Sequence, residues 1–249
     1  MPTRAPSSST SDVVVAGVDG CRLGWVVATG VARAGDRPEL STLEVIPRIA
    51  PLLDRARTGE LHAVGIDMPF GLPDSGTRAC DVAARARLGP RRSSVFPAPP
   101  RPLLGSPDHA AALRRSRAID GRGVSIQSFN LLAKIGELDD ALDADLAERV
   151  VEAHPESSFA EMAGGPLPTT KRTAEGRAVR RRLLETEVGG ALAVLDDGAT
   201  GGTRRGAAPD DVLDAVAALW TAARWALGAA ILLGDDQRDR RGLPMRVAV

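Results

Sequence analysis

Two aspartates of this chain, Asp19 and Asp67, each follow a short apolar segment and precede a turn rich in glycine or proline. Residues 17–19 read Gly-Val-Asp and residues 65–67 read Gly-Ile-Asp. A carboxylate at the end of a buried strand is costly unless an arginine, the N–H groups of a helix end or a metal ion meets it. Two carboxylates about 4 Å apart repel by roughly 4 kcal/mol at an effective dielectric of about 20, and protons or divalent cations would relieve that repulsion.

A third acidic group lies near the C-terminus, where Asp211 and Asp214 follow a proline in a segment that predicts a helix over residues 209–230. The two residues are three apart, so they share one face of that helix. The acids of the first turn could serve the helix dipole alone, whereas Asp214 lies deeper, between apolar neighbours. If Asp214 meets Asp19 and Asp67, an all-oxygen ligand set favours Mg²⁺ or Mn²⁺ over zinc. We therefore expect these three aspartates to hold the metal.

A further pair of candidates follows another apolar segment, residues 149–154, which predicts a strand that runs into His154-Pro155-Glu156. One interpretation is a histidine with satisfied hydrogen bonds followed by a glutamate at a helix start. The other makes Glu156 a further metal ligand or base, with His154 handling protons or contacting the substrate.

These side chains need strands to position them. Apolar patterning predicts five strands, at residues 13–18, 25–28, 40–45, 61–66 and 149–154. Gly20 and Gly24 supply the turn chemistry between the first two, and the third closes an antiparallel meander. A helix in the later half of residues 46–57 leads to the fourth strand. That arrangement makes the first and fourth strands parallel neighbours and puts Asp19 and Asp67 at one edge of the sheet.

We predict that residues 12–249 form a single domain, with an insertion around residues 77–145. Further helices are predicted at residues 77–88, 126–142, 157–162 and 174–187. Residues 242–249 form a final loop or a short strand. Residues 1–11 are expected to be a disordered tail, and residues 198–208 are rich in glycine.

The stretch from Arg78 to Arg122 is locally basic, with ten arginines against three acidic residues. It includes a segment at residues 89–102 that is too rich in proline for a helix or an interior strand. The stretch is either a solvated surface or a phosphate-contacting insertion. In the second interpretation the donors are Arg91, Arg92, Ser93 and Ser94. We also expect Lys171, one of only two lysines, to contact the substrate.

Composition limits the class of protein. The chain has 249 residues with 32 basic and 32 acidic side chains, so a globally basic nucleic-acid footprint is excluded and any site for a polyanion must be local. Cys21 and Cys80 make no zinc pattern and are expected to be buried, reduced thiols. No apolar run reaches membrane-spanning length. We expect a cytoplasmic protein without a membrane partner, either a monomer or a homodimer.

Several motifs, in order along residues 13–249, resemble domain-of-unknown-function family 429, whose members are identified as predicted RNase H-like nucleases. The motifs are Gly17-Val18-Asp19-Gly20-Cys21-Arg22, Gly65-Ile66-Asp67, Cys80-Asp81, the loop at residues 89–96, His154-Pro155-Glu156 and Asp214-Ala215. The resemblance implies a mixed five-stranded α/β sheet of the RNase H type, with its first three strands antiparallel and helices on both faces.

The chain also resembles the Holliday-junction resolvase branch of the RNase H-like superfamily. Those enzymes place an Asp on the first strand, an acid after the fourth strand and an Asp-x-x-Asp-Ala pair on the last helix. The matching residues are Asp19, Asp67, Asp211 and Asp214. The resemblance implies that these four act in catalysis. The His154-Pro155-Glu156 element is not part of a minimal resolvase core, and our preferred prediction gives Glu156 an assisting role beside Asp211.

The preferred prediction is a nuclease or phosphodiesterase that uses Mg²⁺ or Mn²⁺ and acts on nucleic acid by a two-metal carboxylate mechanism. Two alternatives stay open. One is a nucleotide-binding phosphotransferase of the actin-like superfamily, which shares this strand topology. The other is a catalytically silent binding protein that has kept the RNase H-like fold.

Overall fold

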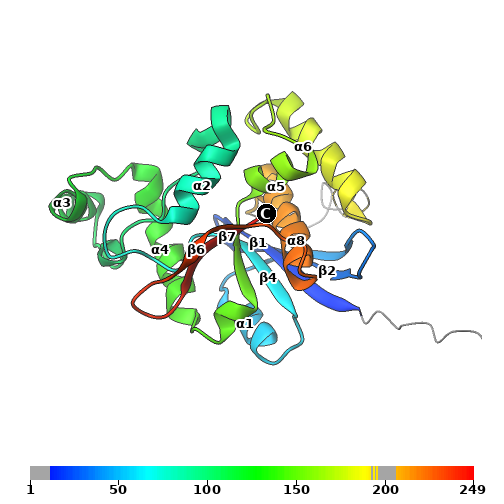
Figure 1. Cartoon of the computed structure of the whole chain (residues 1–249), viewed down its shortest axis with the longest axis horizontal. Helices are drawn as coiled ribbons and strands as arrows, with labels where there is room; N and C mark the ends of the chain where they lie inside the picture. The colour runs from blue at the N-terminus through cyan, green and yellow to red at the C-terminus, as the bar shows by residue number, and fades with distance from the viewer. Residues whose placement is uncertain (1–11, 192, 194, 196–205) are drawn as a thin grey trace, which may run out of the picture.

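The protein is built around one sheet of seven strands, in the order β3-β2-β1-β4-β5-β7-β6 (Figure 1). The computed structural model describes residues 12–191, 193, 195 and 206–249. The predicted tail at residues 1–11 and residues 198–205 of the glycine-rich segment lie outside these described residues. The strands are β1 (Val13–Cys21), β2 (Gly24–Ala32), β3 (Glu39–Ile46), β4 (Ala63–Asp67), β5 (Val150–Ala153), β6 (Leu232–Arg238) and β7 (Pro244–Ala248).

The strand directions make this a mixed α/β fold, as predicted. β1, β2 and β3 pair antiparallel, β4 is parallel to β1, and β5 is parallel to β4. The predicted count of five strands is wrong, because a C-terminal hairpin adds β7, parallel to β5, and β6, antiparallel to β7. β6 has an irregular register and mostly exposed residues, as edge strands often do, so it carries no apolar alternation.

The helices follow the predicted pattern closely, with one addition. The helices are α1 (Ala50–Arg57), α2 (Ala79–Leu88), α3 (His109–Asp120), α4 (Ile126–Ala141), α5 (Pro155–Met162), α6 (Ala174–Glu187) and α8 (Pro209–Ala226). The sequence patterns above predict no helix at α3, which lies at the far left of Figure 1. The proline-rich arm at residues 89–102 begins with a short 3-10 helix, Gly89–Ser94.

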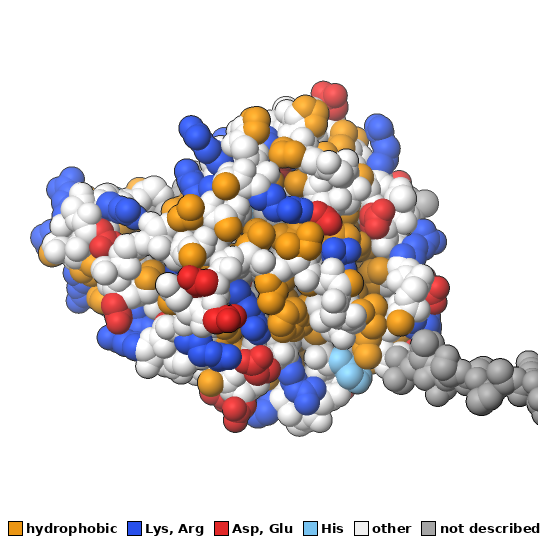
Figure 2. Space-filling view, viewed as in Figure 1, with side chains coloured by type: hydrophobic (Ala, Val, Ile, Leu, Met, Phe, Trp, Pro, Cys, Tyr) orange, Lys and Arg blue, Asp and Glu red, His pale blue; other side chains and the backbone are white. Residues whose placement is uncertain are grey.

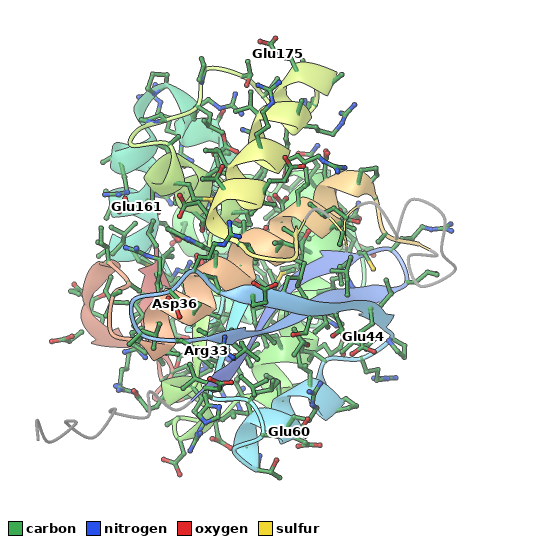
Figure 3. All side chains as sticks on the ribbon, turned by 90° about the vertical axis from the view of Figure 1, so that its right-hand side faces the viewer. Arg33, Asp36, Glu44, Glu60, Glu161 and Glu175 are labelled. Atoms are coloured by element: carbon green, nitrogen blue, oxygen red, sulfur yellow. The ribbon has the colours of Figure 1, made fainter. Side chains whose placement is uncertain are left out.

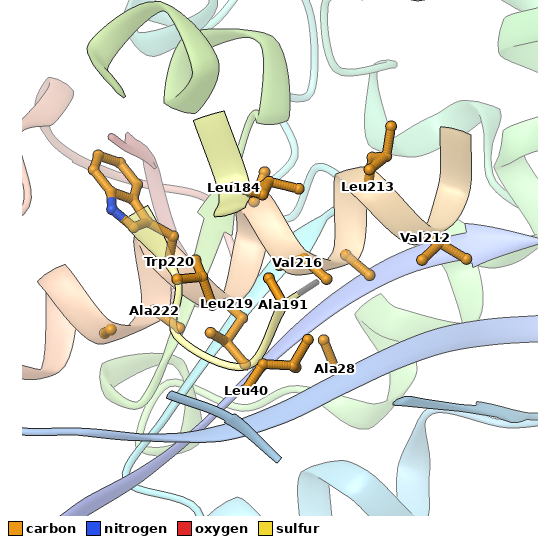
Figure 4. Packing of buried hydrophobic residues seen from close by; sticks show 14 of the residues in the cluster. Ala28, Leu40, Leu184, Ala191, Val212, Leu213, Val216, Leu219, Trp220 and Ala222 are labelled. Carbon is orange, nitrogen blue, oxygen red and sulfur yellow. The ribbon is translucent and has the colours of Figure 1, made fainter. Parts of the chain in front are cut away.

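Helices cover both faces of the sheet. One hydrophobic cluster joins the sheet to α5, α6 and α8, and a second joins its other face to α1 and α4. α8 is buried all round from Val212 to Ala223, because it lies between the sheet and α6 (Figure 3). Figure 4 shows its Val216 and Leu219 over Ala28 and Leu40 of the strands. A helix buried in this way needs no continuous polar face.

Two glycines let the backbone of α8 lie directly on the sheet. Gly17 of β1 and Gly65 of β4 are register partners. A Cβ atom at Gly17 would lie 2.1 Å from the carbonyl oxygen of Ala215, and one at Gly65 would lie 2.4 Å from the carbonyl oxygen of Ala218. No larger residue fits at either position without moving α8 away from the strands.

We expect Gly17→Ala to lower the free energy of unfolding by about 3 kcal/mol, since the added methyl group would overpack a backbone contact. Urea denaturation followed by circular dichroism measures the change. Gly136→Ala is the matched control, because a Cβ atom at Gly136 in α4 meets nothing within 4 Å. The control should be neutral or should stabilise the helix by up to about 1 kcal/mol. Similar losses in both variants would contradict the close packing of α8.

Candidate metal centre

The alternation of side chains along β1 and β4 sends Asp19 and Asp67 to the face that α8 covers. Side chains two residues apart on a strand share a face, so each aspartate lies on the same side as the glycine two positions before it. Asp19 and Asp67 are themselves register partners in the parallel pair. Their carboxylates therefore emerge side by side at the end of both strands, as predicted from the sequence.

α8 supplies the third carboxylate. Asp214 directly precedes Ala215, the residue whose carbonyl oxygen lies over Gly17. One carboxylate oxygen from each of Asp19, Asp67 and Asp214 lies within 4.8 Å of the others. Asp19 and Asp214 are buried and Asp67 is half-buried. The structure thus brings together the three residues expected to hold the metal, here called the aspartate trio.

The trio has too few positive partners for its charge. Asp214 accepts a hydrogen bond from Lys171 in an ion pair, and Asp19 Oδ1 accepts one from the backbone N–H of Gly20 at 2.7 Å. No described residue donates a hydrogen bond to the carboxylate of Asp67. Three carboxylates beside one ammonium group leave an excess of two negative charges, the charge of one divalent cation. An all-oxygen donor set fits Mg²⁺ or Mn²⁺.

The surroundings shift the carboxyl groups toward their protonated forms when no cation is bound. Burial, together with the charges of Asp67 and Asp214, raises the pKa of Asp19 well above its ordinary value. Burial also raises the pKa of Asp67 and of Asp214 to about 6 each, against the opposing effect of Lys171. Burial lowers the pKa of Lys171, but the charge and hydrogen bond of Asp214, together with the charges of Asp67 and Asp19, outweigh burial and raise that pKa overall.

Asp211 lies beside the trio and not in it. Its Oδ2 accepts a hydrogen bond from the backbone N–H of Ala208 at 2.8 Å and so closes the first turn of α8. Burial raises the pKa of Asp211, and its charge in turn raises the pKa of Asp19. The residue therefore combines the helix-start role with an electrostatic effect on the site.

His154 caps α5 at the end of β5. Its Nδ1 accepts a hydrogen bond from the backbone N–H of Ser157 at 3.2 Å, so Nε2 carries the proton and donates to the carbonyl oxygen of Ser94 at 3.3 Å. Burial lowers the pKa of His154 and favours this neutral form. Both ring nitrogens have partners, as the first interpretation of this residue expects.

Glu156 is buried but does not join the trio. Arg180 Nη2 donates to both carboxylate oxygens, at 2.7 and 2.8 Å, and Arg91 Nε donates to Oε1 at 3.2 Å. Arg180 is fully buried, although it belongs to a helix rich in arginine. Glu156 and Arg180 are 24 positions apart and meet only in the folded chain, so no local signal predicts this pair.

Several arginines of the basic stretch form internal ion pairs, which neither interpretation of that stretch includes. Arg78 is buried and bonds to Asp81 and Glu152. Arg101 is buried and pairs with Asp139 and Asp239. The spacing of Arg78 and Asp81, three residues apart at the start of α2, is the one local signal for these pairs.

Other residues of the stretch do lie at the surface. Arg92 and Ser93 are exposed, while Ser94 is half-buried and its hydroxyl donates to the carbonyl oxygen of Arg91 at 2.7 Å. On the face drawn in Figure 2, Lys and Arg side chains are mixed with acidic and apolar ones. Cys21 and Cys80 are buried free thiols, as predicted. Within the described residues, no helix is both long enough and apolar enough to cross a membrane.

A family model with the description "Protein of unknown function (DUF429)" matches residues 17–238. The chain belongs to the DUF429 family. The Thermus thermophilus RuvC structure is similar to this DUF429 protein at 13% sequence identity, over 87% of this chain and 98% of that one, with a TM-score of 0.37. No curated protein matches the chain.

The raised pKa values predict a stability that depends on pH in the metal-free DUF429 protein. Between the ordinary value of 3.8 and about 6, the folded state keeps protons that the unfolded chain has lost. The trio's contribution to stability is therefore present below pH 4 and is lost as the pH rises through 6. Asp67→Asn removes one charge, so in chelator it should be more stable than wild type by about 2–3 kcal/mol at pH 8.

Urea denaturation at pH 4 and pH 8 tests this expectation. At pH 4 the difference between the two proteins should nearly vanish, because the wild-type carboxyl is then protonated and resembles the amide. An Asp67→Asn variant that is less stable than wild type at pH 8 would contradict the account of the trio.

Lys171 occupies Asp214 and would compete with any cation at the trio, which yields a second expectation for the DUF429 protein. Lys171→Met should bind Mn²⁺ about tenfold more tightly, a gain of about 1.4 kcal/mol, because the competing ammonium is gone. Titration calorimetry at pH 7.5 measures the affinity. Arg172→Met is the control, since Arg172 is the next residue along the chain, is exposed, and donates no hydrogen bond from its side chain to the trio. Weaker Mn²⁺ binding by Lys171→Met would show that the lysine does not oppose the ion.

Proposed function

We propose that this protein is a nuclease or phosphodiesterase of the RNase H-like type that depends on Mg²⁺ or Mn²⁺. The observation that carries the proposal is the trio: three carboxylates from two parallel strands and one helix, with one oxygen of each within 4.8 Å of the others and a single lysine paired with Asp214. A buried charge imbalance of this size is costly, and a divalent cation is the partner that relieves it.

The order of the strands supports the proposal. β3-β2-β1-β4-β5, with the first three antiparallel and the next two parallel, is the arrangement that an RNase H-like core requires. The β6-β7 hairpin extends this core at one edge. The acidic residues lie at the ends of β1 and β4 and on α8, so the core itself positions them.

In this proposal Asp19, Asp67 and Asp214 hold the metal ions, and Asp211 strengthens the negative potential at their rim. When bound, such ions polarise a phosphodiester and supply a nucleophilic water and a stabilised leaving oxygen. Lys171 is half exposed beside Asp214, so its ammonium group can turn to a phosphate of the substrate. We assign the substrate to nucleic acid, with DNA and RNA both open.

The arm that follows α2 supplies the remaining substrate contacts. Arg92 and Ser93 are exposed donors for phosphate. The other proposed substrate contacts are Arg91, Ser94 and His154. Each is held in position by its own hydrogen bonds and would meet the substrate from that position. Glu156, held by Arg180 and Arg91, serves catalysis by positioning this arm against α5 and α6.

Hydrolysis of labelled single-stranded, duplex, hybrid and junction substrates in Mn²⁺ tests the proposal. We expect wild type to cleave at least one of them, and Asp19→Asn to lose at least a hundredfold in rate, since a ligand for the ions is gone. Asp36→Asn is the matched control. Asp36 is exposed in the loop after β2 (Figure 3). The last residue of β2, Ala32, pairs with Val13 at the start of β1, whereas Asp19 lies near the other end of that strand.

Two outcomes would overturn the proposal. Equal rates for wild type and Asp19→Asn would show that any cleavage comes from elsewhere. A protein that binds no Mn²⁺ while fully folded would favour the catalytically silent alternative.

A further inference from the structure

Phe96 is the one exposed side chain among the tryptophans and phenylalanines, all of which lie in the described part of the chain. The chain has three Trp, four Phe and no Tyr. Phe96 is 52% exposed, whereas the other six are buried or half-buried. Several aliphatic side chains are exposed as well, and a single exposed apolar residue is ordinary on a protein surface, so the inference rests on the place of this aromatic ring in the fold.

The arm that carries Phe96 is held in place by its neighbours. Val95 and Ala98 are buried on either side. The carbonyl oxygen of Val95 accepts a hydrogen bond from Arg85 at 2.8 Å, and the backbone N–H of Ala98 donates to Asp81 at 3.0 Å. Prolines at positions 97, 99 and 100 fix the backbone further. The ring is therefore presented outward by a rigid support, which lowers the entropy lost when a ligand binds.

The arm lies at the same edge of the sheet as the trio. Glu152 of β5 is the register partner of Ile66, so the next residues, Ala153 and Asp67, are level in neighbouring strands. His154 follows at once and donates a hydrogen bond to the carbonyl oxygen of Ser94. Phe96 is two residues further on, a step of at most about 7 Å. Arg92, exposed in the same arm, adds a positive charge for a phosphate.

We propose that Phe96 is a stacking platform for an unpaired base, and that the substrate is nucleic acid with single-stranded nucleotides. This deepens the function proposed above and rests on it for the reaction. A base has a free face for stacking only when it is unpaired or at an end, and aromatic side chains stack on bases regardless of sequence. The platform, at the same edge of the sheet as the trio, would hold one base while a phosphate of the same strand lies at the carboxylates.

Binding measurements in the Asp19→Asn background test the platform without cleavage. The probes are a fluorescein-labelled 15-nucleotide single strand, as DNA and as RNA, and a blunt duplex of the same sequence, read by anisotropy. We expect Phe96→Ala to weaken binding of the single strand about tenfold and to leave the duplex unchanged, and Phe96→Trp to restore the affinity. Val82→Ala is the control, because Val82 is 56% exposed on α2.

A single strand that carries 2-aminopurine gives a second readout. Stacking on Phe96 should quench its fluorescence, and Phe96→Ala should remove the quenching. Thermal unfolding of the variants checks the fold, which loss of an exposed ring should leave intact.

The outcomes separate this inference from the proposed function. Equal loss of affinity for single strand and duplex, or no loss in Phe96→Ala, overturns the platform even if wild type cleaves with Mn²⁺. Binding of single strands that depends on Phe96, in a protein that cleaves nothing, supports the platform and overturns the nuclease.

Discussion

The close contact between α8 and the two central parallel strands determines the rest of the site. Gly17 and Gly65 lack the Cβ atoms that would strike the carbonyl oxygens of Ala215 and Ala218. Because the helix lies this close to the sheet, Asp214 comes within reach of Asp19, near the end of β1, and of Asp67, the last residue of β4. A helix held further from the sheet by larger side chains would leave the carboxylates apart. The packing of small residues is thus also the geometry of the candidate metal centre.

The site is costly for the metal-free protein. Burial and mutual repulsion raise the pKa values of the trio, and Lys171 relieves only part of the charge. The clustered carboxylates lower the stability of the metal-free protein at the position where the proposed function needs them, as residues of functional sites often do. The same lysine can pair with the carboxylate of Asp214 or with a phosphate, so a cation at the trio would free it for the substrate.

The arginines of the insertion divide into two groups with different roles. Arg78 and Arg101 are buried. Arg78 joins Asp81 of α2 to Glu152 of β5, and Arg101 joins Asp139 of α4 to Asp239 in the turn between β6 and β7. A buried arginine needs such partners, since an unpaired charge in the interior is strongly unfavourable. The Arg78 pairs tie α2 to β5, and the Arg101 pairs tie the arm to α4 and to the turn of the β6-β7 hairpin. The firm support they provide lets the arm between them present Arg92 and Phe96 to solvent.

The sequence by itself determined the central strands, most helices and the shared sheet edge of Asp19 and Asp67, because each follows from local rules. Asp214 joins these two aspartates only through the packing of α8 on the sheet. Apolar patterning identifies strands, and a helix between parallel strands puts their ends at one edge. Only the tertiary structure decided that Glu156 pairs with Arg180, that Arg101 meets Asp239 across 138 positions, and that β6 extends the sheet. Those features depend on which distant side chains and backbone edges meet after packing, and no pattern of neighbouring residues encodes that choice.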